Sequence, residues 1–155
     1  MDQATEITPN LYLGPLVVAR DLAELERLKI TAIVCAAAEG RAHFPDRFDY
    51  LEMAHLVEHN CDIDDIVSSL GDIVTFYDKQ QQQQGGEGKV FVHCVHGRTR
   101  SASIVTYLLA KQMGCSIRDA YKTIVQKRDV LIPEHWLEAL ESKLSFSRRC
   151  KKEKK

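Results

Sequence analysis

The sequence predicts an α/β fold: a single domain in which a central, mainly parallel sheet is flanked by helices. Two observations lead to this expectation. Residues 30–35 and 89–93 are short runs in which apolar and β-branched side chains occupy both parities, as in strands buried on both faces. Segments with helical periodicity alternate with these strands along most of the chain. A length of 155 residues suits one domain with one core.

The elements before the second of these strands follow from local patterns. Residues 7–13 form an extended segment that ends at a Gly-Pro turn, residues 19–29 repeat leucine at helical spacing, and residues 50–56 resume as a strand. Asp62 stands among acids that favour a helix N-terminus, so we expect one helix from there to Tyr77. The glutamines and glycines of residues 80–88 predict a flexible surface loop.

The second strand leads through a tight turn into a helix. Residues 100–113 have a long apolar face, and Gly114 can end this helix as a left-handed cap. Ser116 can cap a further helix that runs to about residue 128, and Pro133 starts the last helix.

Composition and charge limit the class of function. Hydrophobic residues make up 45% and charged residues 28% of the chain, as in ordinary globular proteins. The formal net charge of −1 gives no sign of a basic, nucleic-acid-binding face, so we expect no stable nucleic-acid partner. Six cations and one acid fall in the last eight residues, so the rest of the chain is acidic. We expect residues 1–147 to form the domain and residues 148–155 a basic, disordered tail.

The sequence also bears on compartment. No apolar run approaches the roughly 20 residues that span a bilayer, and the first residues lack the pattern of a secretory signal. The five cysteines lack paired spacing, which favours reduced thiols over a disulfide framework. We therefore expect a cytoplasmic protein, with the nucleus as the alternative, and no integral membrane contact.

The segment between the second strand and its helix carries the candidate chemistry. Cys94 ends the strand and Arg100 opens the helix, so the residues between them can form a loop whose N–H groups all turn inward. The intervening residues are Val95, His96, Gly97, Arg98 and Thr99. Such a nest at the positive end of a helix dipole binds a tetrahedral anion, so we expect phosphate or sulfate here, held by Arg100 through two oxygens. The same field lowers the pKa of Cys94 and makes it a nucleophile.

Neighbouring residues can assist this cysteine. Gly97 allows the backbone to approach a ligand closely. Ser101 or Thr99 can donate a hydroxyl hydrogen bond to the thiolate and stabilise it as a leaving group. His93 either orients Cys94 through hydrogen bonds or is a buried histidine satisfied by the backbone, and the sequence leaves both open.

The loop matches the C-x5-R-[ST] signature of the cysteine-dependent protein tyrosine phosphatases, and residues 7–145 resemble their dual-specificity branch. Residues 7–14 (ITPNLYLG) are similar to the branch's opening I-x-P-x-L-[YF]-[LI]-G, and residues 29–34 (KITAIV) to its GI-T-x-V-[LI] strand. Residues 128–136 (RDVLIPEHW) resemble R-x-x-[IV]-x-P-N-x-[FG], with Glu134 where asparagine is usual. The resemblance implies the protein tyrosine phosphatase-like fold.

The resemblance also implies an activity, namely hydrolysis of phosphotyrosine, phosphoserine or phosphothreonine on proteins, with protein kinases among the candidate substrates. In this mechanism Cys94 attacks phosphorus, Arg100 and the loop amides hold the equatorial oxygens, and water then hydrolyses the phosphocysteine. Neither a metal nor a cofactor is needed.

The family also uses an aspartate as general acid, on the loop before the preceding helix. Alignment from that helix places the acid on Asn60 and alignment from the strand places it on Val57, neither of which can donate a catalytic proton. Among the nearby carboxylates we select Asp62 as the general acid, with Glu58 as the second choice. A third possibility is that no acid is placed at the site. A plain helix N-cap is the alternative role for Asp62.

Other functions stay open. A histidine two residues after the cysteine, as at His96, also resembles the loop of RNA 5′-triphosphatases related to this family. Some relatives with basic loops act on phosphoinositides. A phosphate-dependent binding module with little turnover would need the loop but not the acid. No other dense basic cluster lies in the body of the chain, so phosphoproteins are preferred. A metal site built on His93, Cys94 and His96 lacks further ligands nearby, and the C-x5-R-S spacing disfavours rhodanese-type sulfur transfer.

Overall fold

The computed structural model describes residues 3–37, 41–53 and 62–153. Within these ranges the strands form one mixed sheet in the order β1-β2-β5-β3-β4. The strands are β1 (Thr5–Thr8), β2 (Leu11–Pro15), β3 (Ala32–Cys35), β4 (Asp49–Glu52) and β5 (Val90–Cys94). The helices are α1 (Leu16–Ala19), α2 (Leu22–Arg27), α3 (Ile63–Val67), α4 (Leu70–Gln83), α5 (Arg100–Met113), α6 (Ile117–Lys127) and α7 (Glu134–Glu153). The expected α/β architecture is confirmed.

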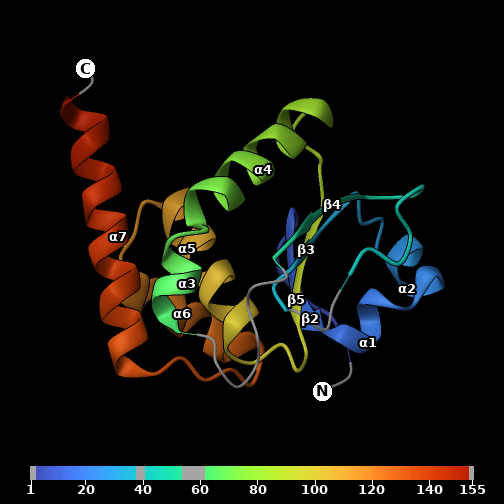
Figure 1. The fold of residues 1–155 in the computed structure, drawn as a ribbon, viewed down its shortest axis with the longest axis horizontal. Helices are drawn as coiled ribbons and strands as arrows, with labels where there is room; N and C mark the ends of the chain where they lie inside the picture. Colours follow the sequence, from blue (N-terminus) through green and yellow to red (C-terminus); the bar gives the residue numbers. More distant parts are fainter. Residues whose placement is uncertain (1–2, 38–40, 54–61, 154–155) are drawn as a thin grey trace.

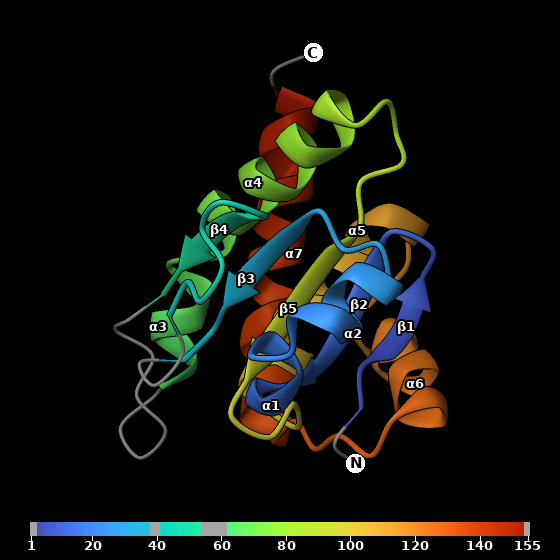
Figure 2. The same ribbon diagram turned by 90° about the vertical axis from the view of Figure 1, so that its right-hand side faces the viewer.

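Helices cover both faces of the sheet, as Figures 1 and 2 show: α1 and α2 lie on one face, and α3 to α7 lie on the other. All pairs are parallel except β1 with β2. β5 is the central strand, and each of its residues is buried. Since side chains alternate along a strand, Cys94 belongs to the core shared with α5, while Phe91 belongs to the core under α1 and α2. The fold therefore places Cys94 at the carboxyl end of the most protected strand.

The two helix caps predicted from the sequence, at the end of α5 and at the start of α6, are present in the structure. Gly114 ends α5 in the left-handed conformation, with a φ of 65°, and its N–H donates to the carbonyl of Ala110. Ser116 caps α6 and accepts a hydrogen bond from the N–H of Asp119. Both predicted caps are confirmed, because they depend on residues within one turn of the helix end.

The first half of the chain differs from expectation in two places. The extended segment is a hairpin of β1 and β2, and the helix predicted from Asp62 is interrupted at Ser68 and Ser69 to give α3 and α4. The loop predicted over residues 80–88 is wrong for residues 80–83, where α4 continues, whereas residues 84–88 lie outside helices and strands as expected. Gln80 is buried in this helix and its Nε2 donates to Asp49 Oδ2 over 2.7 Å, which ties the glutamine run to β4.

The basic tail expected from residue 148 is also helical, as far as residue 153. Residues 148–153 form the end of α7. Arg148 gives the physical reason, because its Nη2 donates to the carbonyls of Ala110 and Cys115 over 3.2 and 2.8 Å. A cation at the carboxyl end of α5 complements the helix dipole, and it adds a hydrogen bond to the Ala110 carbonyl, which also accepts the N–H groups of Gly114 and Cys115.

Candidate active site

The loop between β5 and α5 brings the predicted site residues together. Cys94 is the last residue of β5, Arg100 is the first of α5, and both side chains are buried. Ser101 lies one residue further along the helix, and its Oγ is 3.1 Å from Cys94 Sγ. The hydroxyl partner of the thiol is therefore Ser101, whereas Thr99 Oγ1 donates to the carbonyl of Leu131 over 2.8 Å.

The carbonyl groups of the loop all have partners outside it. Leu16 N–H donates to the Val95 carbonyl over 3.0 Å, and Leu131 N–H donates to the Arg98 carbonyl over 3.0 Å. Arg128 serves the two carbonyls between them: its Nη2 donates to His96 over 3.2 Å and its Nε to Gly97 over 2.9 Å. Because these carbonyls point outward, the loop N–H groups are available to the interior, which is the arrangement that binds an oxyanion.

Arg128 has contacts with the loop that were not predicted from the sequence. Besides the loop carbonyls, its Nη1 donates to the Gln3 carbonyl over 2.7 Å and to Thr5 Oγ1 over 3.2 Å. One guanidinium therefore joins the loop between β5 and α5 to the first strand of the sheet. The signal in the sequence is its place at the start of the RDVLIPEHW segment, which carries the resemblance but says nothing of its contacts.

Gly97 is required where the loop meets β2. It has a φ of +69°, and a Cβ at this position would lie 2.7 Å from the Gly14 carbonyl oxygen and 2.8 Å from Arg128 Nη2. Only glycine combines this backbone conformation with so close an approach. The sequence predicted close approach to a ligand at Gly97, and the structure adds close approach to the neighbouring strand.

The Cys94 thiol has a pKa below the ordinary cysteine value. Burial alone would raise this pKa, but hydrogen bonds from the Ser101 hydroxyl, from the N–H groups of Ser101 and Gly97, and the charge of Arg100 together outweigh it. Cys35, by contrast, has only burial and the nearby Glu52 carboxylate, which raise its pKa to about 12. The loop therefore favours the thiolate at Cys94 specifically.

His93 lies on the opposite face of the sheet from the thiol. Its ring stacks on Phe91, and its Nδ1 is 3.4 Å from the carbonyl oxygen of Cys94. Burial, together with the charges of His43, Arg100 and Arg20, lowers the pKa of His93 to about 4, although the Cys94 carbonyl opposes this shift. His93 is thus neutral at physiological pH and contacts the backbone of Cys94 rather than its sulfur.

Asp62 is the N-cap of α3. Its carboxylate accepts the N–H of Ile63 over 2.7 Å and also the N–H of Asp65, and the Asp65 side chain accepts the Asp62 N–H in return, which completes a capping box. The capping role that the sequence offered as an alternative is therefore present. The competing acid candidate, Glu58, lies outside the described residues, as do Val57 and Asn60.

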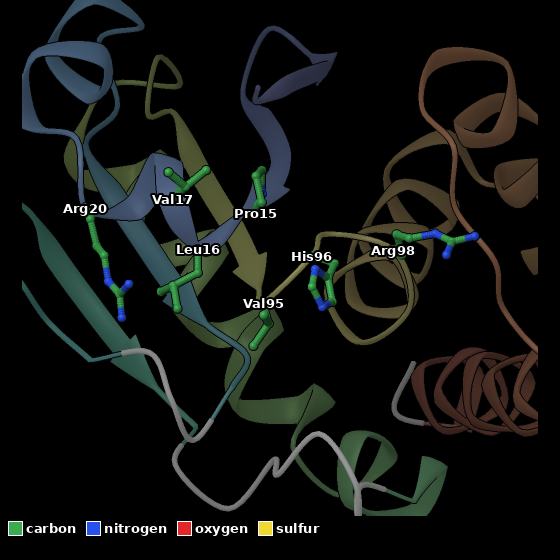
Figure 3. A pocket seen from close by; sticks show the side chains of 7 residues that line it. All are labelled: Pro15, Leu16, Val17, Arg20, Val95, His96 and Arg98. Carbon is green, nitrogen blue, oxygen red and sulfur yellow. The ribbon is translucent and has the colours of Figure 1, made fainter. Parts of the chain in front are cut away.

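A groove with a volume of about 490 Å³ opens beside the loop. Its walls come from the end of β2, from α1 and from the loop itself. Figure 3 shows Arg20 on one wall and His96 on the other, with Leu16 and Val95 between them, while the side chain of Arg98 is directed away. Two residues make this loop basic, His96 and Arg98, and both are exposed to solvent at the mouth of the loop. In the described part of the chain, no three His, Cys, Asp or Glu side chains cluster as metal ligands, and no helix is long and apolar enough to cross a membrane.

Comparison with known sequences identifies close relatives of this fold. The family model for the dual specificity phosphatase catalytic domain matches residues 11–143. The chain is 31% identical over 128 residues to dual specificity protein phosphatase 1-A of Xenopus laevis, covering 83% of this chain and 33% of that protein. It is also 31% identical over 133 residues to the Xenopus laevis protein phosphatase Slingshot homolog, covering 86% of this chain and 18% of that protein. The chain spans a third or less of the length of these relatives.

Comparison with solved structures gives the same fold. The human tyrosine phosphatase-like serine/threonine/tyrosine-interacting protein superposes with a TM-score of 0.82 at 25% identity, covering 95% of this chain and 99% of that one. DUSP15 gives 0.79 at 25% identity, with 98% and 97% covered. PTPMT1 in complex with PI(5)P gives 0.75 at 21% identity, with 96% and 99% covered, a likeness of fold alone.

Proposed function

Because the chain belongs to the family of dual specificity phosphatase catalytic domains, we propose that it hydrolyses phosphate monoesters on phosphorylated proteins through a phosphocysteine intermediate. The observation that carries this proposal is the lowered pKa of Cys94 beneath a loop whose carbonyls are all engaged outside it. Phosphotyrosine, phosphoserine and phosphothreonine are the substrate groups, and protein kinases are candidate substrates. We place the reaction in the cytoplasm or the nucleus, where thiols stay reduced.

The reaction proceeds in two displacements. Cys94 Sγ attacks phosphorus as the thiolate, the bond to the ester oxygen breaks, and Arg100 with the loop N–H groups stabilises the charge on the equatorial oxygens. A proton passes to the leaving oxygen, and the dephosphorylated side chain departs. Water then attacks the phosphocysteine, the S–P bond breaks, and the Ser101 hydroxyl stabilises the departing thiolate. The products are orthophosphate and the restored thiolate.

The decisive experiment measures hydrolysis of p-nitrophenyl phosphate and of phosphopeptides by the purified protein. We expect activity in the wild type and none in Cys94→Ser. Cys115→Ser is the matched control, because Cys115 is a free, partly buried cysteine at the far end of α5. Hydrolysis that survives in Cys94→Ser, or is absent from the wild type, contradicts the proposal.

Asp62 is the proposed source of the proton for the leaving oxygen. Asparagine caps helices about as well as aspartate, so Asp62→Asn keeps the end of α3 while it removes the acid. We expect this variant to lose more turnover on phosphopeptides than on p-nitrophenyl phosphate, whose leaving group needs little protonation. Equal losses on both substrates would assign Asp62 to capping alone.

The second candidate function is phosphate-dependent binding with little turnover. It is favoured by the likeness to the human protein whose name describes it as tyrosine phosphatase-like and interacting, and by the capping role of Asp62. Retained binding of phosphopeptides by a wild type that does not hydrolyse them supports this candidate. Faster release of phosphate from a 5′-triphosphorylated RNA or from a phosphoinositide than from phosphopeptides would replace both candidates.

A further inference from the structure

Arg20 lies on the wall of the groove that opens beside the loop between β5 and α5. It directly follows α1, its backbone N–H donates to the Val18 carbonyl, and its side chain lines the groove beside the loop. Its charge is also among those that lower the pKa of His93, directly beneath the loop. Arg20 is therefore held near the phosphate site without belonging to it (Figure 3).

The charge of Arg20 has no acidic partner among the described residues, and no Asp or Glu lines the groove. Three other exposed arginines pair with glutamates: Arg27 with Glu24, Arg47 with Glu26, and Arg118 with Glu134. In an acidic chain, such pairing is easily available. Arg20 consequently produces a local positive potential beside the active-site loop, which attracts an anionic group carried by the substrate.

The groove also has an apolar floor, which favours a peptide over a small phosphate ion as the molecule that binds there. Leu16 and Val95 lie between Arg20 and His96, and Val17 is 53% exposed at the rim. On the other side of the loop, Leu131 is 57% exposed, and its N–H is bonded to the Arg98 carbonyl. Aliphatic side chains thus flank the loop on both sides, as the path of an extended polypeptide requires.

We propose that the groove between Arg20 and His96 binds an acidic side chain adjacent to the phosphorylated residue, so that Arg20 determines a preference for acidic substrate sequences. This inference rests on the proposed function and deepens it by naming the substrate class. The phosphoryl group occupies the loop, the neighbouring backbone crosses Leu16 and Val95, and the carboxylate pairs with the guanidinium. Arg20 acts on specificity and takes no part in the displacement at phosphorus.

The test compares phosphotyrosine peptides in which glutamate replaces alanine at one flanking position at a time. For each protein variant, kcat/KM is divided by the value for p-nitrophenyl phosphate, which isolates recognition from chemistry. At low salt we expect the wild type to prefer glutamate at one or two positions by about two- to fivefold, the range that an exposed ion pair supplies. This preference should fall as salt is raised, because the pair is exposed to solvent.

Three variants assign the preference. Arg20→Ala should abolish it, Arg20→Lys should retain part of it, and Arg27→Ala, which removes an arginine outside the groove, should leave it intact. Equal rates for glutamate and alanine peptides in the wild type, or a preference that survives in Arg20→Ala, overturn the inference. So does an Arg20-dependent preference for a phosphoinositide over every peptide. Absence of p-nitrophenyl phosphate hydrolysis is a separate outcome, because it refutes the proposed function instead.

Discussion

Replacing Ser101 with alanine measures how much one hydroxyl contributes to the reactivity of Cys94. The two side chains are buried, and Ser101 Oγ lies 3.1 Å from the sulfur. A hydrogen bond to a charged group contributes about 1.5–3 kcal/mol, and one pKa unit corresponds to about 1.4 kcal/mol. We therefore expect S101A to remove about 1.5–3 kcal/mol of thiolate stabilisation and so to raise the pKa of Cys94. The N–H groups of Ser101 and Gly97 and the charge of Arg100 remain in the variant, so part of the lowering persists.

The rate of alkylation by iodoacetamide, followed against pH, reports the thiolate fraction of Cys94 once the rate for Cys94→Ser is subtracted. Its midpoint should move upward in S101A, and the phosphocysteine should break down more slowly because its leaving group is less stable. Ser103→Ala is the matched control. Ser103 is buried on the same helix, but its Oγ donates to the Thr99 carbonyl over 2.7 Å and not to the sulfur.

An unchanged midpoint in S101A would show that the N–H groups and Arg100 alone lower the pKa, and the reasoning from the hydroxyl would fail. A midpoint that moves equally in S101A and S103A would point instead to a general loosening of α5.

Three further predictions follow from the same site. Burial lowers the pKa of His93 from 6.5 to about 4, so the folded state resists protonation of this side chain, and the unfolding free energy should fall by up to about 3 kcal/mol between pH 6.5 and pH 4. Urea unfolding at several pH values tests this expectation, and the H93N variant should lack the fall. G97A places a Cβ 2.7 Å from a carbonyl oxygen of β2, so it should unfold at lower urea concentration and lose activity, whereas G71A, which meets open space in α4, should be neutral or stabilise by up to about 1 kcal/mol. R128K cannot reproduce the forked contacts of the guanidinium, so its kcat/KM should fall about tenfold or more while the neighbouring exposed K127A keeps wild-type activity.

The parts of the site that the sequence predicts are those made within a short stretch of chain. Cys94, Arg100 and Ser101 fall within eight consecutive residues, and the strand before them and the helix after them are both evident from apolar patterning. Their mutual placement follows from the geometry of a strand that enters a helix through a tight loop. The caps at Gly114 and Ser116 are predictable for the same reason.

The parts that escape prediction depend on partners far along the chain. Arg128 reaches carbonyls 31 and 32 residues earlier, and nothing in local patterning specifies that contact. Gln80 is helical and buried because Asp49, 31 residues before it, accepts its hydrogen bond, whereas the composition of the surrounding glutamine and glycine segment is typical of a loop. Arg148 likewise binds carbonyls of a different helix. In each case tertiary packing overrides a correct reading of local propensity.

The contacts of Arg128 also bear on when the protein becomes reactive during its synthesis. They join positions separated by 125 and 123 residues, and contacts between distant positions form late because the intervening chain must first be ordered. Cys94 is synthesised 34 residues before Arg128. We therefore expect the nascent cysteine to behave as an ordinary thiol, and to become a nucleophile only when the segment around Gln3 and the segment around Arg128 have met.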